Sequence, residues 1–100
     1  MRRGDLVEPG AGVIPPKLER QAAARFPEMA RRVGKTEASV TVRVLVDENG
    51  KVIDTQIAEK VGFGFDAEAL AVAKKSTFTP ATKSGVPVKM WIEFKVGFKG

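Results

Sequence analysis

The chain has 100 residues, 43% of them hydrophobic, which suits one small domain with its own core. It contains neither cysteine nor histidine, which excludes disulfides, thiolate nucleophiles, imidazole bases and the usual zinc sites. There is no apolar run of about eighteen residues and no apolar leader after Met1-Arg2-Arg3. We therefore expect a soluble chain, which could be a fragment of an anchored protein.

The net charge of +5 is unevenly distributed. Residues 1–35 hold eight basic and four acidic residues, residues 36–70 three and seven, and residues 71–100 six and one. We interpret this as a mixed, solvated surface, with a basic face for an anionic partner as the alternative. No nucleic-acid motif accompanies the charge, so we expect no nucleic acid as a partner. The carboxylates have no catalytic, phosphate-loop or calcium-loop pattern around them, and we expect no enzyme, no metal and no cofactor.

Residues 1–22 are predicted to form a linker or an extended N-terminal arm, and residues 23–100 a domain. Five prolines and glycines within eight positions discourage both helix and strand in the arm: Pro9, Gly10, Gly12, Pro15 and Pro16. Val13 and Ile14 are apolar, so part of the arm could lie against the domain.

A short first helix is predicted to start at Phe26-Pro27 and to end before Gly34, with an apolar stripe of Phe26, Met29, Ala30 and Val33. A second helix is predicted over residues 66–77, with Asp66 as its N-cap and Pro80 preventing continuation. The loop before it, residues 62–65, is predicted to be a turn with two buried phenylalanines.

Residues 39–47 alternate valine with other residues and predict a strand with Val40, Val42, Val44 and Val46 on one face. Asn49-Gly50 predicts a hairpin into a second strand over residues 51–59. In that strand Val52 and Ile57 are five residues apart and cannot share a face in a regular strand. We favour a bulge near Asp54-Thr55, with Ile53 and Ile57 as the buried pair in the alternative case.

The last strand, residues 86–98, has apolar residues at every second position, and Trp91 is the exception on the other parity. It is about twice the usual strand length, so we expect it to overhang its neighbours and to expose unpaired backbone groups. The predicted core combines this strand with the others: Val40, Val42, Val44, Val46, Ile57, Leu70, Phe78, Val88, Met90, Ile92 and Phe94.

The predicted fold is α+β, a two-layer sandwich of a three-stranded sheet with two helices on one face. The predicted strand order is 2-1-3, with the last strand antiparallel to the first. We expect a partner strand, or a second copy of the chain, to pair along the last strand. The sequence does not determine which parity of that strand points its backbone groups to the free side. The predicted partner-binding residues are Lys89, Met90, Trp91, Ile92, Glu93, Phe94, Lys95 and Val96.

The order of these elements and their motifs resemble the C-terminal domain of the TonB energy-transducer family. The resemblance runs from about Ala24 to Phe98 and rests on Phe26-Pro27, the Asp47 to Val52 hairpin, Phe65-Asp66 and the Phe78 to Val88 run. Phe26 stands where the family has tyrosine, and Phe65 where it has leucine. The resemblance adds Phe26 and Pro27 to the predicted partner-binding residues.

The resemblance implies a periplasmic domain, tethered to the inner membrane by an anchor absent from this chain. Such a domain binds the N-terminal box peptide of an outer-membrane transporter by strand addition and delivers energy from inner-membrane proton-channel partners. A homodimer through the last strand is a further possibility. The alternatives are a structural module of another envelope protein, for motility or sensing, and a peptidoglycan-binding module.

Overall fold

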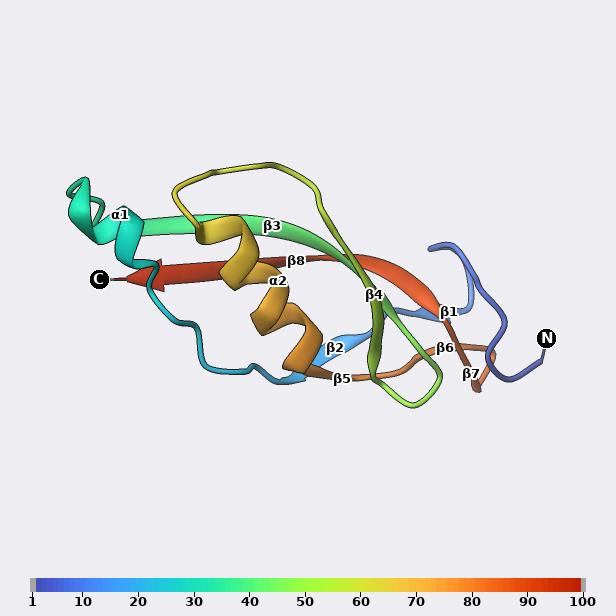
Figure 1. Cartoon of the computed structure of the whole chain (residues 1–100). Coiled ribbons are helices and arrows are strands. Elements are labelled where there is room, and N and C mark those ends of the chain that lie inside the picture. Colours follow the sequence, from blue (N-terminus) through green and yellow to red (C-terminus); the bar gives the residue numbers. More distant parts are fainter. Residues whose placement is uncertain (1, 100) are drawn as a thin grey trace.

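A computed structural model describes residues 2–99 of the chain; Met1 and Gly100, the ends of the two predicted segments, lie outside the described residues. The main sheet contains β3 (Glu37–Val46), β4 (Val52–Ile57) and β8 (Met90–Lys99) in the antiparallel order β4-β3-β8. Helix α2 (Phe65–Lys75) crosses one face of this sheet (Figure 1). Helix α1 (Glu28–Arg32) lies at one end and buries Ala30 in the same core. The predicted α+β fold is confirmed.

The β3–β4 hairpin forms where Asn49-Gly50 predicted it. The buried Asp47 carboxylate accepts hydrogen bonds from the N–H groups of Asn49 and Lys51, both at 2.9 Å, which closes the turn. The bulge lies at Ile53, since the register shifts between the pairs Leu45–Asp54 and Val46–Val52. It is one residue earlier than predicted, but it still brings Val52 and Ile57 against the core. Ile53 is 51% exposed, so the alternative with Ile53 buried is wrong.

Two small sheets were not predicted. In one, β1 (Val13–Ile14) pairs with β6 (Ala81–Lys83), which also pairs with β7 (Val86–Val88). In the other, β2 (Lys17–Arg20) pairs with β5 (Thr77–Thr79). The predicted strand 86–98 is therefore two strands, β7 and β8, because the pairing partner changes from β6 to β3 at Lys89. The predicted overhang past the neighbouring strand is wrong, since β8 pairs with β3 along its whole length. The second helix ends at Lys75, two residues early, since the chain continues directly into β5.

Several details around the helices correct the predictions. Met29 and Val33 are exposed, because α1 is only five residues long and lies at the end of the sheet, where little covers that side. Gly34 does end the helix, with φ +80°. The carboxylate of Asp66 accepts hydrogen bonds from Val61 and Gly62 in the preceding loop, while Gly64 is the N-cap. In that loop only Phe65 is buried, and Phe63 is exposed.

The buried residues form two clusters. The larger lies between α2 and the main sheet and contains the four alternating valines of β3 with Phe78 and Phe94. Ile57, Leu70 and Ile92 of the predicted core are half-buried against it. Val88 and Met90 belong to the smaller cluster with Ala81, so the predicted core is divided. The predicted core omitted residues that α2 and the end of β8 contribute: Ala69, Val72, Ala73, Val96 and Phe98. Phe65 was predicted to be buried, but only as part of the turn before α2.

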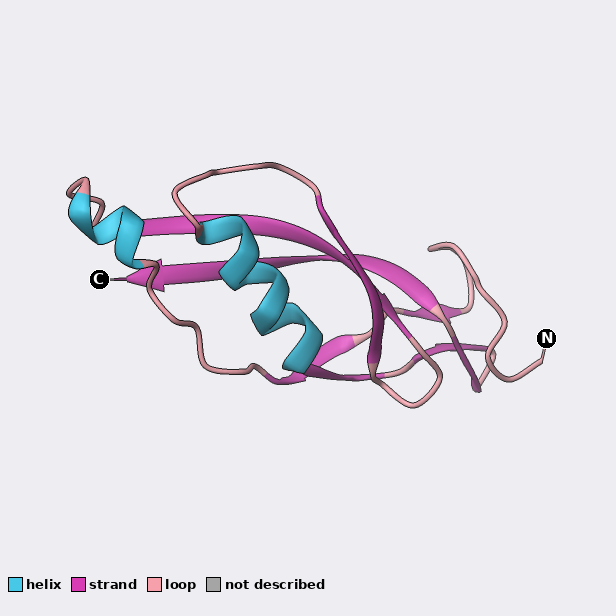
Figure 2. Cartoon of the chain, in the orientation of Figure 1, coloured by secondary structure: helices cyan, strands magenta, loops and turns pink. Residues whose placement is uncertain are grey.

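The molecule is elongated, with Cα extents of 50 × 20 × 17 Å. Strand β8 follows the long direction, and the two ends of the chain lie at opposite ends of the molecule (Figure 1). Both helices lie in the half that contains the C-terminus, and the other half is made of strands and loops, into which β3, β4 and β8 extend (Figure 2). The arm before α1 returns along the molecule from the N-terminal end.

Candidate partner-binding edge

Strand β8 is an edge strand of the main sheet, and the pairing of β3 determines which of its backbone groups are free. The Thr41 carbonyl accepts a hydrogen bond from the Ala58 N–H, at 3.0 Å, on the β4 side of β3. Successive residues of an antiparallel strand point these groups to opposite sides, so Val40, Val42, Val44 and Val46 point theirs toward β8. Opposite these valines lie Val96, Phe94, Ile92 and Met90. The free side of β8 therefore presents the N–H and C=O groups of Trp91, Glu93, Lys95 and Gly97.

Lys89 supports this assignment independently. Its N–H donates to the Asp5 carbonyl at 2.8 Å, and its carbonyl accepts from the Val7 N–H at 3.0 Å. This is a parallel pairing of the N-terminal arm with the same odd-numbered edge. The arm therefore occupies the beginning of the edge, and the open part starts at Trp91.

The predicted partner-binding residues of β8 fall into two groups. The side chains of Met90, Phe94 and Val96 are buried in the core, and Ile92 is half-buried. The side chains of Trp91, Glu93 and Lys95 lie on the opposite face of the sheet from the helices. A strand added to this edge would form its hydrogen bonds with the backbone of the second group.

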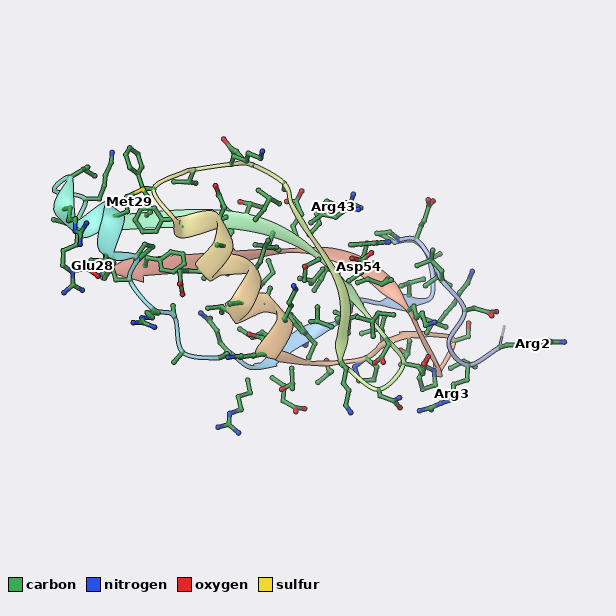
Figure 3. The ribbon with its side chains drawn as sticks, in the orientation of Figure 1. Arg2, Arg3, Glu28, Met29, Arg43 and Asp54 are labelled. Carbon is green, nitrogen blue, oxygen red and sulfur yellow. The ribbon has the colours of Figure 1, made fainter. Side chains whose placement is uncertain are left out.

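Trp91 is not an exception to the pattern once the outer face is considered. The Arg43 guanidinium of β3 lies 5.1 Å from the centroid of its ring, which is a cation–π contact. Arg43 projects from the sheet in the middle of the molecule (Figure 3). The indole thus has a cationic neighbour on the solvent face, which explains an aromatic residue at a position of polar parity.

Phe26 and Pro27 lie at the other end of β8. The ring of Phe26 packs edge-on against Phe65 at 5.4 Å between centroids, and Phe65 packs against Phe98 at 5.2 Å. Arg31 stacks over Phe26 at 5.6 Å. A pocket of about 440 Å³ opens here, lined by residues 25–28, Arg31 and Glu68. The structure does not bring these two residues beside Trp91, so the predicted site is spread along the length of β8.

Comparison with known families agrees with this architecture. The family model of the Gram-negative bacterial TonB protein C-terminal domain matches residues 22–99. The chain belongs to this family. The resemblance seen in the sequence is thereby confirmed, and it begins within two residues of the predicted boundary.

A solved relative shares the TonB C-terminal fold. The solution NMR structure of the Pseudomonas aeruginosa TonB C-terminal domain superposes with a TM-score of 0.55 and 25% sequence identity. The match covers 90% of this chain and 86% of that one. No curated protein sequence matches the chain significantly.

Sequence reasoning missed the residues outside β8 that border its edge. Arg43 carried no signal beyond its position on the outer face of a strand, and Leu6, Glu8 and Pro9 belong to an arm that was expected to be extended.

Within residues 2–99, no group of three or more carboxylates could hold a metal ion. Neither described helix has the length and apolar character required to cross a membrane.

Proposed function

We propose that this TonB C-terminal domain binds the N-terminal box peptide of outer-membrane transporters as an added strand on β8. It would act in the periplasm and transmit energy derived from the proton-motive force for uptake. The observation that carries the proposal is the row of free backbone groups at Trp91, Glu93, Lys95 and Gly97. Such a row is what strand addition requires.

The energetics of this edge favour binding of extended peptides with little dependence on their sequence. Each of the four residues offers one donor and one acceptor, and each hydrogen bond formed contributes about 0.5–1.5 kcal/mol net. Because the bonds are to the backbone, the added strand needs an extended conformation more than a particular sequence. A domain with this edge could therefore serve more than one transporter.

The direction of β8 suits the transmission of force. The strand lies along the 50 Å axis of the molecule, so a peptide paired with it lies along the same axis. A pull along that axis loads all the new hydrogen bonds together in shear, whereas a pull across it would open them one by one. In this proposal the pull is supplied through a tether to the inner membrane and its proton-channel partners.

The test combines peptide binding with proline substitutions. Peptides spanning the N-terminal residues of outer-membrane transporters are added to the ¹⁵N-labelled domain, and the amides of Trp91, Glu93, Lys95 and Gly97 are expected to shift. Proline lacks the N–H group. Glu93→Pro should therefore keep the fold and lose binding, while Ile92→Pro should lose a hydrogen bond to β3 and unfold the domain.

Glu93→Gln is the matched control, because it removes the charge and keeps the N–H group. If both Trp91→Pro and Glu93→Pro melt like the wild type and still bind peptide, β8 is not the docking edge. A wild-type dimer in sedimentation that becomes monomeric in Glu93→Pro, with no peptide bound by either protein, would assign the edge to a second copy of the chain.

A further inference from the structure

The N-terminal arm and the open edge together enclose a pocket that the sequence did not indicate. Its volume is about 610 Å³, and it is lined by residues 6–9 of the arm, Arg43 of β3 and residues 91–93 of β8. Most of the lining is apolar: Leu6, Val7, Pro9, Trp91 and Ile92. The pocket lies where the paired part of the β8 edge ends and its open part begins.

The pairing of the arm shows how an added residue presents its side chain. Leu6 lies opposite Lys89, so both side chains point to the outer face of the sheet, the face that carries Trp91. Leu6 is 61% exposed there, although it is apolar. A residue added opposite Trp91, the next position of the same parity, would point its side chain to that same face and thus into the pocket.

The arm also limits how far an added strand can extend. The Val7 N–H is the last arm group among residues 2–99 that is bonded to this edge, and Glu8 and Pro9 then border the pocket. A strand that advances along β8 from Gly97 toward Trp91 therefore meets the arm at the pocket. Backbone pairing alone repeats every two residues and would allow the strand to slip by that amount.

We propose that this pocket accepts one large aliphatic or aromatic side chain of the added strand, carried opposite Trp91, and thereby determines its register. This inference rests on the proposed strand addition to β8. Backbone hydrogen bonds would provide most of the affinity, and the pocket would determine which residue of the added strand lies opposite Trp91, next to the arm. The occupant is apolar because Leu6, Pro9 and Trp91 line the pocket and Arg43 already stacks on the indole, while Glu8 and Glu93 are its remaining charged lining residues.

The experiment uses Trp91, the one tryptophan of the chain, as an internal reporter. The transporter peptide that binds best is synthesised with each residue in turn replaced by alanine, and binding is followed by Trp91 fluorescence and calorimetry. One position should lose about tenfold in affinity, as expected for one apolar side chain. The peptide altered at that position should also no longer shift the Trp91 emission to shorter wavelength.

Two variants of the arm provide the comparison. Leu6→Ala removes a wall of the pocket, and Ile14→Ala removes a side chain that is equally exposed, at 61%, on the same arm but outside the pocket. In Leu6→Ala the difference between the parent peptide and the alanine peptide should fall to about twofold or less. In Ile14→Ala the full difference should remain. Both variants should melt like the wild type.

The outcomes separate the two proposals. If the amides of β8 shift with peptide but both arm variants retain the full difference, strand addition holds and the pocket is not a side-chain site. If a lysine at the selected position binds better than leucine or phenylalanine, the carboxylates of Glu8 and Glu93 dominate and the apolar assignment is overturned. If no peptide shifts the β8 amides, the proposed function fails, and the inference fails with it.

Discussion

At the scale of single residues, Gly50 joins two parts of the molecule. It has φ +82°, its carbonyl accepts the Phe78 N–H at 2.9 Å, and a Cβ atom there would overlap the Phe78 carbonyl oxygen. The hairpin turn is thereby held against β5. Gly50 consequently serves both the backbone conformation of the turn and the contact with the rest of the fold.

Gly50→Ala should therefore destabilise the domain more than Gly85→Ala. Gly85 has φ +84° but open space around it, so alanine there meets only the backbone strain of about 1–2 kcal/mol. At position 50 the overlap with Phe78 should add at least about 1 kcal/mol. Denaturant melts of the two variants check this, and equal losses would show that the turn moves away from β5 without cost.

Phe78 is one of the buried aromatic residues of the larger cluster. It is 4% exposed, and its ring packs edge-on against Phe94 at 5.5 Å. Phe78→Ala should cost about 3–5 kcal/mol in the free energy of unfolding. The exposed Phe63 is the control, and Phe63→Ala should change it by no more than about 0.5 kcal/mol. A loss below about 1 kcal/mol for Phe78→Ala would remove Phe78 from the core.

At the scale of elements, β4 depends on its bulge. The extra residue Ile53 turns outward, so that Val52 and Ile57 pack on the same face despite their odd spacing. Without it, one end of the strand would present the wrong parity to α2. The bulge is thus what lets the hairpin cover the core along its whole length.

Substitutions of two isoleucines of β4 test which face of the strand each one occupies. Ile57→Thr places a hydroxyl against the core and should cost about 1–2 kcal/mol, while Ile53→Thr changes a solvent-facing residue and should stay within about 0.5 kcal/mol. Both substitutions keep a β-branched side chain, so strand propensity is matched. Urea denaturation measures both, and the reverse order of losses would place the bulge elsewhere.

At the scale of the whole molecule, the two hydrophobic clusters differ greatly in size. The smaller one, Ala81, Val88 and Met90, is partly covered by Val7 and Val13 of the N-terminal arm. The arm is held there by backbone hydrogen bonds and a few apolar contacts, since most of its residues are exposed. The half of the molecule that contains β1, β6 and β7 should therefore be the less stable part of the domain.

Native-state hydrogen exchange should resolve this difference. The amides of Val42 and Val44 should exchange only through global unfolding, whereas those of β6 and β7 should exchange through a smaller, local opening. Removal of residues 1–14 should raise the amide exchange rates of β7 and leave those of β3 unchanged. Uniform protection across both clusters would mean that the arm and the main sheet unfold as one unit.

Features that depend on residues close together in the chain could be predicted before the structure was known. The alternating valines of β3, the Asn49-Gly50 hairpin and the apolar parity of β8 all follow from local periodicity and turn chemistry, and the family follows from their order. The prediction of a partner-binding edge also rested on local features, namely the length of the last strand and its position at the end of the chain.

The three-dimensional structure was needed to show which backbone groups of β8 are free, where the strand changes its pairing partner, and which residues border its edge. These properties depend on pairings between residues far apart in the chain, such as Thr41 with Ala58 and Asp5 with Lys89. Both parities of a strand satisfy the same local pattern, and an arm rich in proline has no periodicity that names its neighbour. Long-range hydrogen bonding therefore selected one arrangement from several that the local sequence allowed equally.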